Sequence, residues 1–190
     1  MSLGDIFYSQ YSNFLPDEIL KKLNKEYVAW QNCTYMGNEY TVLSNHKTWG
    51  VDRKIGIIGS CFSLNVSPEL TREVVDYIRN ADCPITSIPA PDYSVLINEW
   101  HPLSGTSLHN EHSALWTLSL SLSKQWDCNM GGLNLIATPE GDFIGNLPIY
   151  NHAYIIQKNL ARLTTTISPL APKPLIELEV VAEKQDFGLA

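Results

Sequence analysis

Two side chains able to bind a metal ion stand two positions apart in the second half of the chain, His109 and Glu111. In an extended segment, residues two apart project to the same side, so both could hold one ion while Asn110 points away. An imidazole, a carboxylate and a second imidazole on one face of a metal form the open site of non-haem iron(II) oxygenases. The same spacing also arises by chance as a surface pair, so both interpretations stay open.

The other histidines are candidates for a third ligand. His152 is the farthest downstream and is the best of them, although a lone histidine is more often packed or solvated. His112 directly follows Glu111 and would face the opposite side of an extended segment. His46 and His101 are weaker candidates.

Length, composition and charge limit the possible classes of protein. The 190 residues, 44% of them apolar, suffice for one domain with a real core. A net charge of −7 without clustered Lys and Arg argues against a nucleic-acid surface. No apolar run approaches the roughly 18 residues that cross a bilayer, and residues 1–5 lack a signal pattern. We therefore expect no membrane partner. The four cysteines form no C-x-x-C pair, so we expect free thiols and a cytoplasmic location.

Apolar periodicity predicts two helices, over 17–30 and 67–80, that pack against the outside of a sheet. Three prolines mark residues 83–92 as a connector. Short strands separated by polar turns then follow, which is typical of a barrel or sandwich. The predicted strands span 93–100, 114–123, 133–137, 153–157, 162–168 and 174–182. We expect a single domain over 1–190, with a helical and irregular part over 1–92 and the core strands over 93–182.

The predicted strand over 114–123 has two chemically different faces. Leucines alternate with small hydroxyl side chains, which are Thr117, Ser119, Ser121 and Ser123. Such a strand can be half-exposed, with its polar face in water. Alternatively, the hydroxyl face lines a polar cavity inside the roll and leaves room for a ligand.

Several short motifs occur in an informative order. One run reads Trp100-His101-Pro102, then Gly105, Leu108, His109 and Glu111. It is followed by Thr117-Leu118, by Leu122-Ser123-Lys124-Gln125-Trp126 and by Gly131-Gly132-Leu133-Asn134-Leu135. This order resembles that of the iron(II)/2-oxoglutarate-dependent dioxygenases of the prolyl-hydroxylase type. The likeness is best over 93–136 and extends to 8–30 and 148–182.

The resemblance implies a fold and a set of roles. The fold would be mainly β, a double-stranded β-helix (jelly roll) flanked by N-terminal helices. The cofactors would be Fe(II) and 2-oxoglutarate. His109 would be the first metal ligand, and Glu111 stands where the family has aspartate. Lys173 stands near the basic residue that pairs with the far carboxylate of 2-oxoglutarate, although it lacks the fork of arginine. Ser121 replaces a tyrosine used against the same carboxylate, and Thr117 would line the pocket with it.

One departure from the family pattern concerns the second ligand histidine. Thr165 occupies its position, and a neutral hydroxyl is a poor iron(II) ligand, while His152 lies one strand too early. Two hypotheses therefore remain open. The chain is a dioxygenase that hydroxylates a C–H bond of a protein or small molecule, or it is a catalytically inactive jelly-roll scaffold. The scaffold would be a binding or structural subunit of a larger assembly, such as a homo-oligomer or a virus particle. A lectin- or cupin-like ligand binder fits the roll but not the motif order.

Overall fold

The computed structural model of the chain describes residues 8–35, 57–58, 61–83, 86, 90, 92–109, 114–157 and 160–183. Its first half contains β1 (Tyr8–Ser12), α1 (Asp17–Tyr35), β2 (Ile57–Ile58), β3 (Cys61–Asn65) and α2 (Pro68–Asn80). Then follow β4 (Asp92–Trp100), β5 (Gly105–Thr106), β6 (Ala114–Ser121) and the 3-10 helix η2 (Cys128–Met130). The last strands are β7 (Asn134–Ala137), β8 (Phe143–Asn146), β9 (His152–Gln157), β10 (Arg162–Thr164) and β11 (Leu175–Glu183). No helix in the described ranges is long and apolar enough to cross a membrane.

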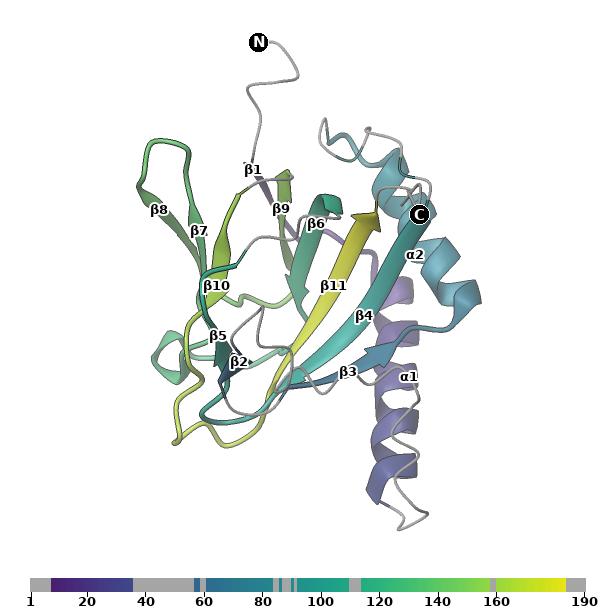
Figure 1. The fold of residues 1–190 in the computed structure, drawn as a ribbon. Helices are drawn as coiled ribbons and strands as arrows, with labels where there is room; N and C mark the ends of the chain where they lie inside the picture. The colour runs from purple at the N-terminus through teal and green to yellow at the C-terminus, as the bar shows by residue number, and fades with distance from the viewer. Residues whose placement is uncertain are drawn as a thin grey trace, which may run out of the picture.

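The strands form a roll of antiparallel sheets (Figure 1). The major sheet has six strands in the order β1-β9-β6-β11-β4-β3, and the minor sheet has three in the order β10-β7-β8. Strands β2 and β5 form a separate pair. Next to them, His109 and Arg162 exchange two backbone hydrogen bonds of 3.0 and 2.9 Å, which join the β5 segment to β10. The predicted jelly-roll fold is therefore confirmed.

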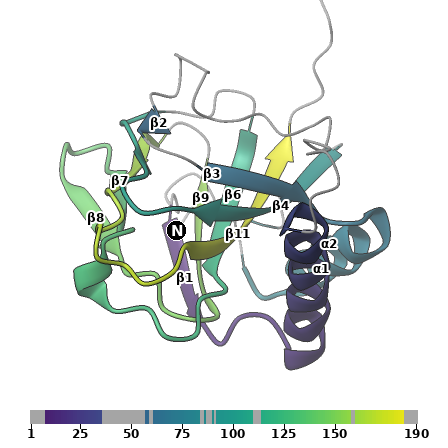
Figure 2. The same ribbon diagram turned by 90° about the horizontal axis from the view of Figure 1, so that it is seen from below.

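The two helices cover the outer face of the major sheet, as predicted (Figure 2). The core between them is made of aliphatic side chains from both layers, including Leu23, Val74, Ile78, Ile97, Leu118, Leu120, Ile155 and Leu178. Each such side chain contributes about 1.5–3 kcal/mol relative to exposure. The leucine face of β6 is thus the core face, and its hydroxyl face must point into the roll.

Both helices differ from the sequence prediction in detail. Helix α1 continues to Tyr35, beyond the predicted end at residue 30. The Ser67 side chain does not cap α2. Instead, the Glu26 carboxylate of α1 accepts hydrogen bonds from the Ser67 backbone N–H, at 3.0 Å, and from its hydroxyl. Tyr77 lies on the apolar stripe of the predicted helix but is 38% exposed, and its hydroxyl donates to the Phe14 carbonyl at 2.8 Å.

The strand predictions hold for the long strands and fail at the short ones. The segment predicted over 162–168 is a strand only to Thr164. Beyond it, the hydroxyl oxygen of Thr165 accepts the Leu133 N–H at 2.8 Å, in place of a ladder bond. Short strands were expected between the two helices without bounds, so β3 was not placed, and β8 was not predicted. These strands have five and four residues and carry no strong β pattern. The thiols of Cys61 and Cys83 are free and buried, as expected.

The turn before β7 requires glycine. Gly131 and Gly132 have φ of 77° and 73°, as predicted for this turn, and the Trp126 indole N–H donates to the Gly131 carbonyl at 3.0 Å. A Cβ atom at Gly131 would lie 2.1 Å from the Thr166 carbonyl oxygen. At Gly141, which also has positive φ, a Cβ would meet nothing within 4 Å.

We therefore expect Gly131→Ala to destabilise the protein far more than Gly141→Ala. Gly141→Ala is the control, and it introduces only the backbone strain of a left-handed conformation, about 1–2 kcal/mol. Gly131→Ala adds a clash with backbone atoms and should cost at least about 2 kcal/mol more. Urea unfolding of both variants measures the difference, and equal free energies of unfolding would contradict the role assigned to Gly131.

Candidate functional site

The inner face of the major sheet is polar. Alternation along β4 and β11 turns Asn98, Glu177 and Glu179 into the roll, where they are 2%, 6% and 5% exposed. Strand β6 adds Ser119, which is 2% exposed. Charged and amide side chains at such depth persist only when they are paired and hydrogen-bonded. The contacts between them therefore determine what the interior can do.

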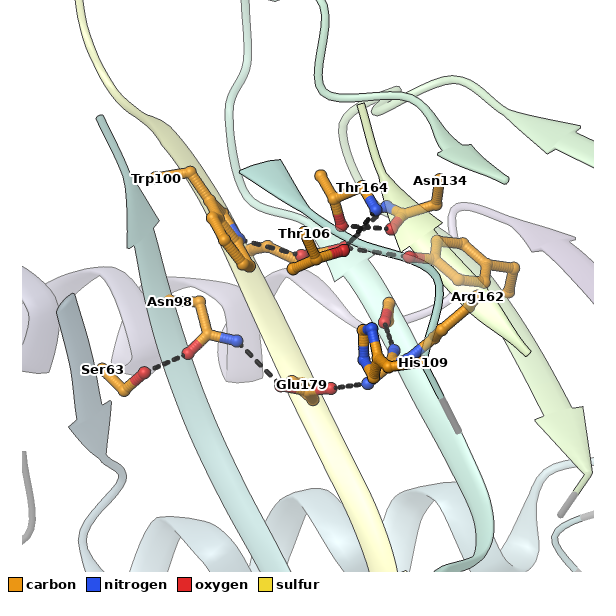
Figure 3. A network of polar contacts seen from close by, with 12 residues as sticks. Ser63, Asn98, Trp100, Thr106, His109, Asn134, Arg162, Thr164 and Glu179 are labelled. Atoms are coloured by element: carbon orange, nitrogen blue, oxygen red, sulfur yellow. Dashed lines mark hydrogen bonds and ion pairs between the residues drawn. The ribbon is translucent and has the colours of Figure 1, made fainter. Parts of the chain in front are cut away.

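One buried ion pair crosses the roll from the minor to the major sheet (Figure 3). The Arg162 guanidinium of β10 is paired with the Glu179 carboxylate of β11, and it also donates to the Ser119 hydroxyl at 3.2 Å. The second oxygen of Glu179 accepts the Asn98 amide at 2.8 Å. The Ser63 hydroxyl in turn donates to Asn98 at 2.6 Å. The pair is thus held by partners from three further strands, β3, β4 and β6.

Glu177 has a separate set of partners. Its carboxylate accepts the Trp100 indole N–H at 3.2 Å, and the Asn134 amide and the Tyr154 hydroxyl at 3.0 Å each. All three donors are neutral. The Arg162 charge also acts on Glu177 and lowers its pKa.

The two glutamates consequently titrate differently. Burial, followed by the negative charge of Glu179, raises the pKa of Glu177 from 4.5 to about 7. Burial would also raise the pKa of Glu179. However, the charge and hydrogen bond of Arg162, together with the Asn98 amide, outweigh burial and lower it. Glu179 is therefore the permanent anion of the interior, and Glu177 changes its charge near neutral pH.

A small pocket lies between these groups. Its volume is about 20 Å³, which is room for about one water molecule. Its walls are Trp100, Thr106, His109, Asn134, Arg162, Thr164, Glu177 and Glu179. His109 is half-buried, and its Nδ1 lies 2.9 Å from the Ser107 carbonyl oxygen. Burial lowers the pKa of His109, and the Arg162 charge lowers it further. The hydrogen bond to the Ser107 carbonyl and the charge of Glu179 raise it, but by less.

The fold was compared with those of known proteins. No protein-family model matches the sequence, and no curated protein matches it. Solved structures do match. A prolyl-4-hydroxylase from Pseudomonas putida has a TM-score of 0.70 at 12% identity, covering 96% of this chain and 95% of that one. The chain has the prolyl-hydroxylase fold.

Two further solved structures share the prolyl-hydroxylase fold. A prolyl hydroxylase from Trichoplax adhaerens, in complex with a hypoxia-inducible-factor peptide fragment, has a TM-score of 0.70 at 10% identity. That match covers 96% of this chain and 86% of that one. A viral collagen prolyl hydroxylase from Paramecium Bursaria Chlorella virus-1 has a TM-score of 0.57 at 12% identity, covering 97% and 100%. Identities this low show the fold alone, so the chemistry must be argued from this chain's own residues.

Of the predicted metal ligands, only His109 is found in the wall of the pocket. Glu111 lies outside the described residues. His152 lies on β9 beside β1, where its two ring nitrogens are 2.6 Å from the Gln10 amide nitrogen and 3.2 Å from the Ser12 hydroxyl. It does not line the pocket.

The residues predicted to hold 2-oxoglutarate do not line the pocket either. Lys173 is exposed, in the segment that precedes β11. Ser121 is buried and accepts the Ser123 N–H at 3.3 Å. The buried hydroxyl of Thr117 has no hydrogen-bond partner among the described residues. The hydroxyl face of β6 does point into the roll, but its closest functional contact is from Ser119 to Arg162.

Sequence reasoning missed the charged centre of the site, which is Arg162, Glu177 and Glu179. The sequence did contain a signal for the two glutamates. They alternate with apolar residues in the last strand, and that strand is buried on both faces. Buried acids at such positions require a partner. The partner, Arg162, could not be identified without the β10 position that the roll gives it.

The residues present do not fit 2-oxoglutarate. A dianion beside these described residues would face the carboxylates of Glu177 and Glu179, and the pocket that they line has a volume of about 20 Å³. Arg162, the buried cation of the described interior, is already paired with Glu179. For iron, no group of three His, Cys, Asp or Glu side chains in the described ranges could hold a metal ion. A 2-oxoglutarate molecule would have to displace the ion pair.

We expect Glu179→Ala to destabilise the protein by about 3–5 kcal/mol, because Arg162 would remain buried without its carboxylate. Replacing both partners, as Arg162→Met with Glu179→Leu, should recover most of that loss, since no unpaired charge remains. Urea unfolding of the single and double variants is the measurement. A loss of only about 1 kcal/mol in Glu179→Ala would mean that the pair is exposed to solvent.

The raised pKa of Glu177 predicts a pH dependence of stability. Between pH 4.5 and about 7, the folded protein keeps a proton that the unfolded chain releases, so stability falls as pH rises. The loss should be at most about 3 kcal/mol. Glu177→Gln does not titrate and should remove this slope, although the amide also costs a hydrogen bond. Unfolding curves across this window compare the two proteins, and identical slopes would contradict the assignment.

Proposed function

We propose that this chain is a non-catalytic protein of the prolyl-hydroxylase fold that serves as a binding or structural subunit. One observation carries the proposal, namely the buried pair of Arg162 and Glu179 across the centre of the roll. In such a roll, an interior cation that remained available could pair with an acidic co-substrate. Here a carboxylate of the chain itself takes that role, so the roll is filled by its own side chains.

The energetics of the interior support a structural role. Opening the pair would separate a buried guanidinium from a buried carboxylate, which costs several kcal/mol per ion. A ligand would have to supply that energy before it gained any affinity. Hydrogen bonds from Asn98 and Ser119 add to the barrier, because they orient the pair. The network therefore stabilises a closed, rigid roll.

A second candidate function, an iron(II)/2-oxoglutarate dioxygenase, is favoured by the position of His109. This imidazole stands in the pocket wall, and burial lowers its pKa, so it is neutral and able to bind a metal at pH 7. Activity would also require Glu111, a third ligand and a different partner for Glu179. The substrate would be a C–H bond of a protein or a small molecule.

Anaerobic titration of the purified protein with Fe(II) and 2-oxoglutarate tests the proposal. We expect no saturable heat of binding, no visible absorption band and no rise in melting temperature at millimolar 2-oxoglutarate, because a ligand that binds the folded state must stabilise it. His109→Ala is the control variant, and it should behave like the unchanged protein. Stoichiometric binding that His109→Ala abolishes would establish the dioxygenase function and overturn the proposal.

A further inference from the structure

The outer face of the minor sheet is apolar in the described part of the structure. Helices α1 and α2 lie on the major sheet, and no described helix or strand lies over the outside of β7 and β8 (Figures 1 and 2). Because Asn134, Ile136 and Asn146 face inward and are buried, the alternate residues of these strands face outward. An outward face of an antiparallel sheet is normally polar.

The outward residues form two parallel rows across the three strands. One row, in register, is Leu163, Leu135 and Gly145. The next is Ala161, Ala137 and Phe143, joined by the backbone bond from Ala137 to Ala161 and the pairing of Ala137 with Phe143. None of the six is charged, although the chain carries a net charge of −7. Phe143 is 54% exposed, and Gly145 is exposed beside it. Exposed apolar surface of this kind marks interaction sites.

The two rows have complementary sizes. Within each strand, a large side chain lies two positions from a small one: Leu163 and Ala161 on β10, Leu135 and Ala137 on β7, and Phe143 and Gly145 on β8. Two copies could face each other across a two-fold axis that lies between their minor sheets. This axis would run perpendicular to the strands, midway between the two rows. It would set every large side chain of one copy on the small one of the other. A surface that complements itself in this way is what a two-fold interface requires.

We propose that this face is a docking surface for a second copy of the same chain. The two minor sheets would pack face to face, about 10 Å apart, with antiparallel strands and Phe143 seated on Gly145 of the other copy. This dimer goes beyond the proposed structural role, because it identifies the partner and the surface. It does not depend on whether the interior binds a ligand.

The size of the face predicts a weak dimer. Three strands with two outward positions each cover a few hundred Å², well below the roughly 800 Å² that each partner buries in a standard interface. We therefore expect association at micromolar to millimolar concentrations. Two copies of an acidic chain repel each other, so added salt should strengthen the dimer by screening that repulsion. A basic partner protein would show the opposite dependence.

Sedimentation equilibrium of the full chain and three variants tests this inference. Phe143→Asp removes the large side chain and should weaken dimerisation at least about tenfold. Gly145→Leu fills the hollow and should weaken it to a similar degree, although it adds apolar surface. Gly145 has no left-handed φ, and a Cβ there meets the Leu135 side chain at an ordinary 3.4 Å, so this variant should fold. The control, Leu170→Asp, changes a residue that is 88% exposed outside the two rows and should leave dimerisation unchanged.

Each outcome decides the matter. A dimer that strengthens with salt and is lost in both Phe143→Asp and Gly145→Leu supports the proposal. A monomer at millimolar concentration overturns it, as does a dimer that Phe143→Asp leaves intact. If Gly145→Leu strengthens association, the contact is non-specific and the proposed packing is wrong. None of these results affects the titration with 2-oxoglutarate, so the dimer and the non-catalytic function fail independently.

Discussion

The structure depends on the pairing of charge inside the roll. Glu179 and Arg162 are on different sheets, and each would be too costly to bury alone. Their ion pair therefore fixes the distance between β10 and β11, and Asn98 and Ser119 fix its orientation. Glu177 accepts hydrogen bonds from three neutral donors, and burial raises its pKa to about 7. The described interior is thus polar, and its buried acids are held by partners from the chain itself.

The two sheets differ in what covers their outer faces in the described part of the structure. The major sheet buries its outer face under α1 and α2 and gains the aliphatic core that holds the domain together. The minor sheet has the same alternation but no helix over it in the described part of the chain, so its outward rows meet solvent. Keeping an apolar outer face has no benefit for a solvated monomer. The uncovered rows and the filled interior therefore agree with a protein whose role is to associate.

Much of the fold could be predicted from the sequence, because long patterned segments carry their own evidence. The stripe of α1, the alternation of β6 and the glycine turn at Gly131 each follow from local rules. The short strands β3 and β8 could not be predicted, since too few residues show a period. Of the residues predicted for the site, His109 lines the described pocket, and its role as a metal ligand stays a prediction. The partners of Glu177 and Glu179 come from strands far apart in sequence, and only the sheet topology brings them together.

The Arg162 guanidinium should stay paired with Glu179 inside the roll whether or not a ligand is added. Nuclear magnetic resonance of the ¹⁵N-labelled protein observes that guanidinium directly, and Arg162→Met assigns its signals. We expect slowly exchanging guanidinium protons at neutral pH whose shifts do not change when millimolar 2-oxoglutarate is added, because the guanidinium is buried and paired with the carboxylate of Glu179. Rapid exchange with solvent, or shifts that move with 2-oxoglutarate, would show that the interior is open and would contradict the account.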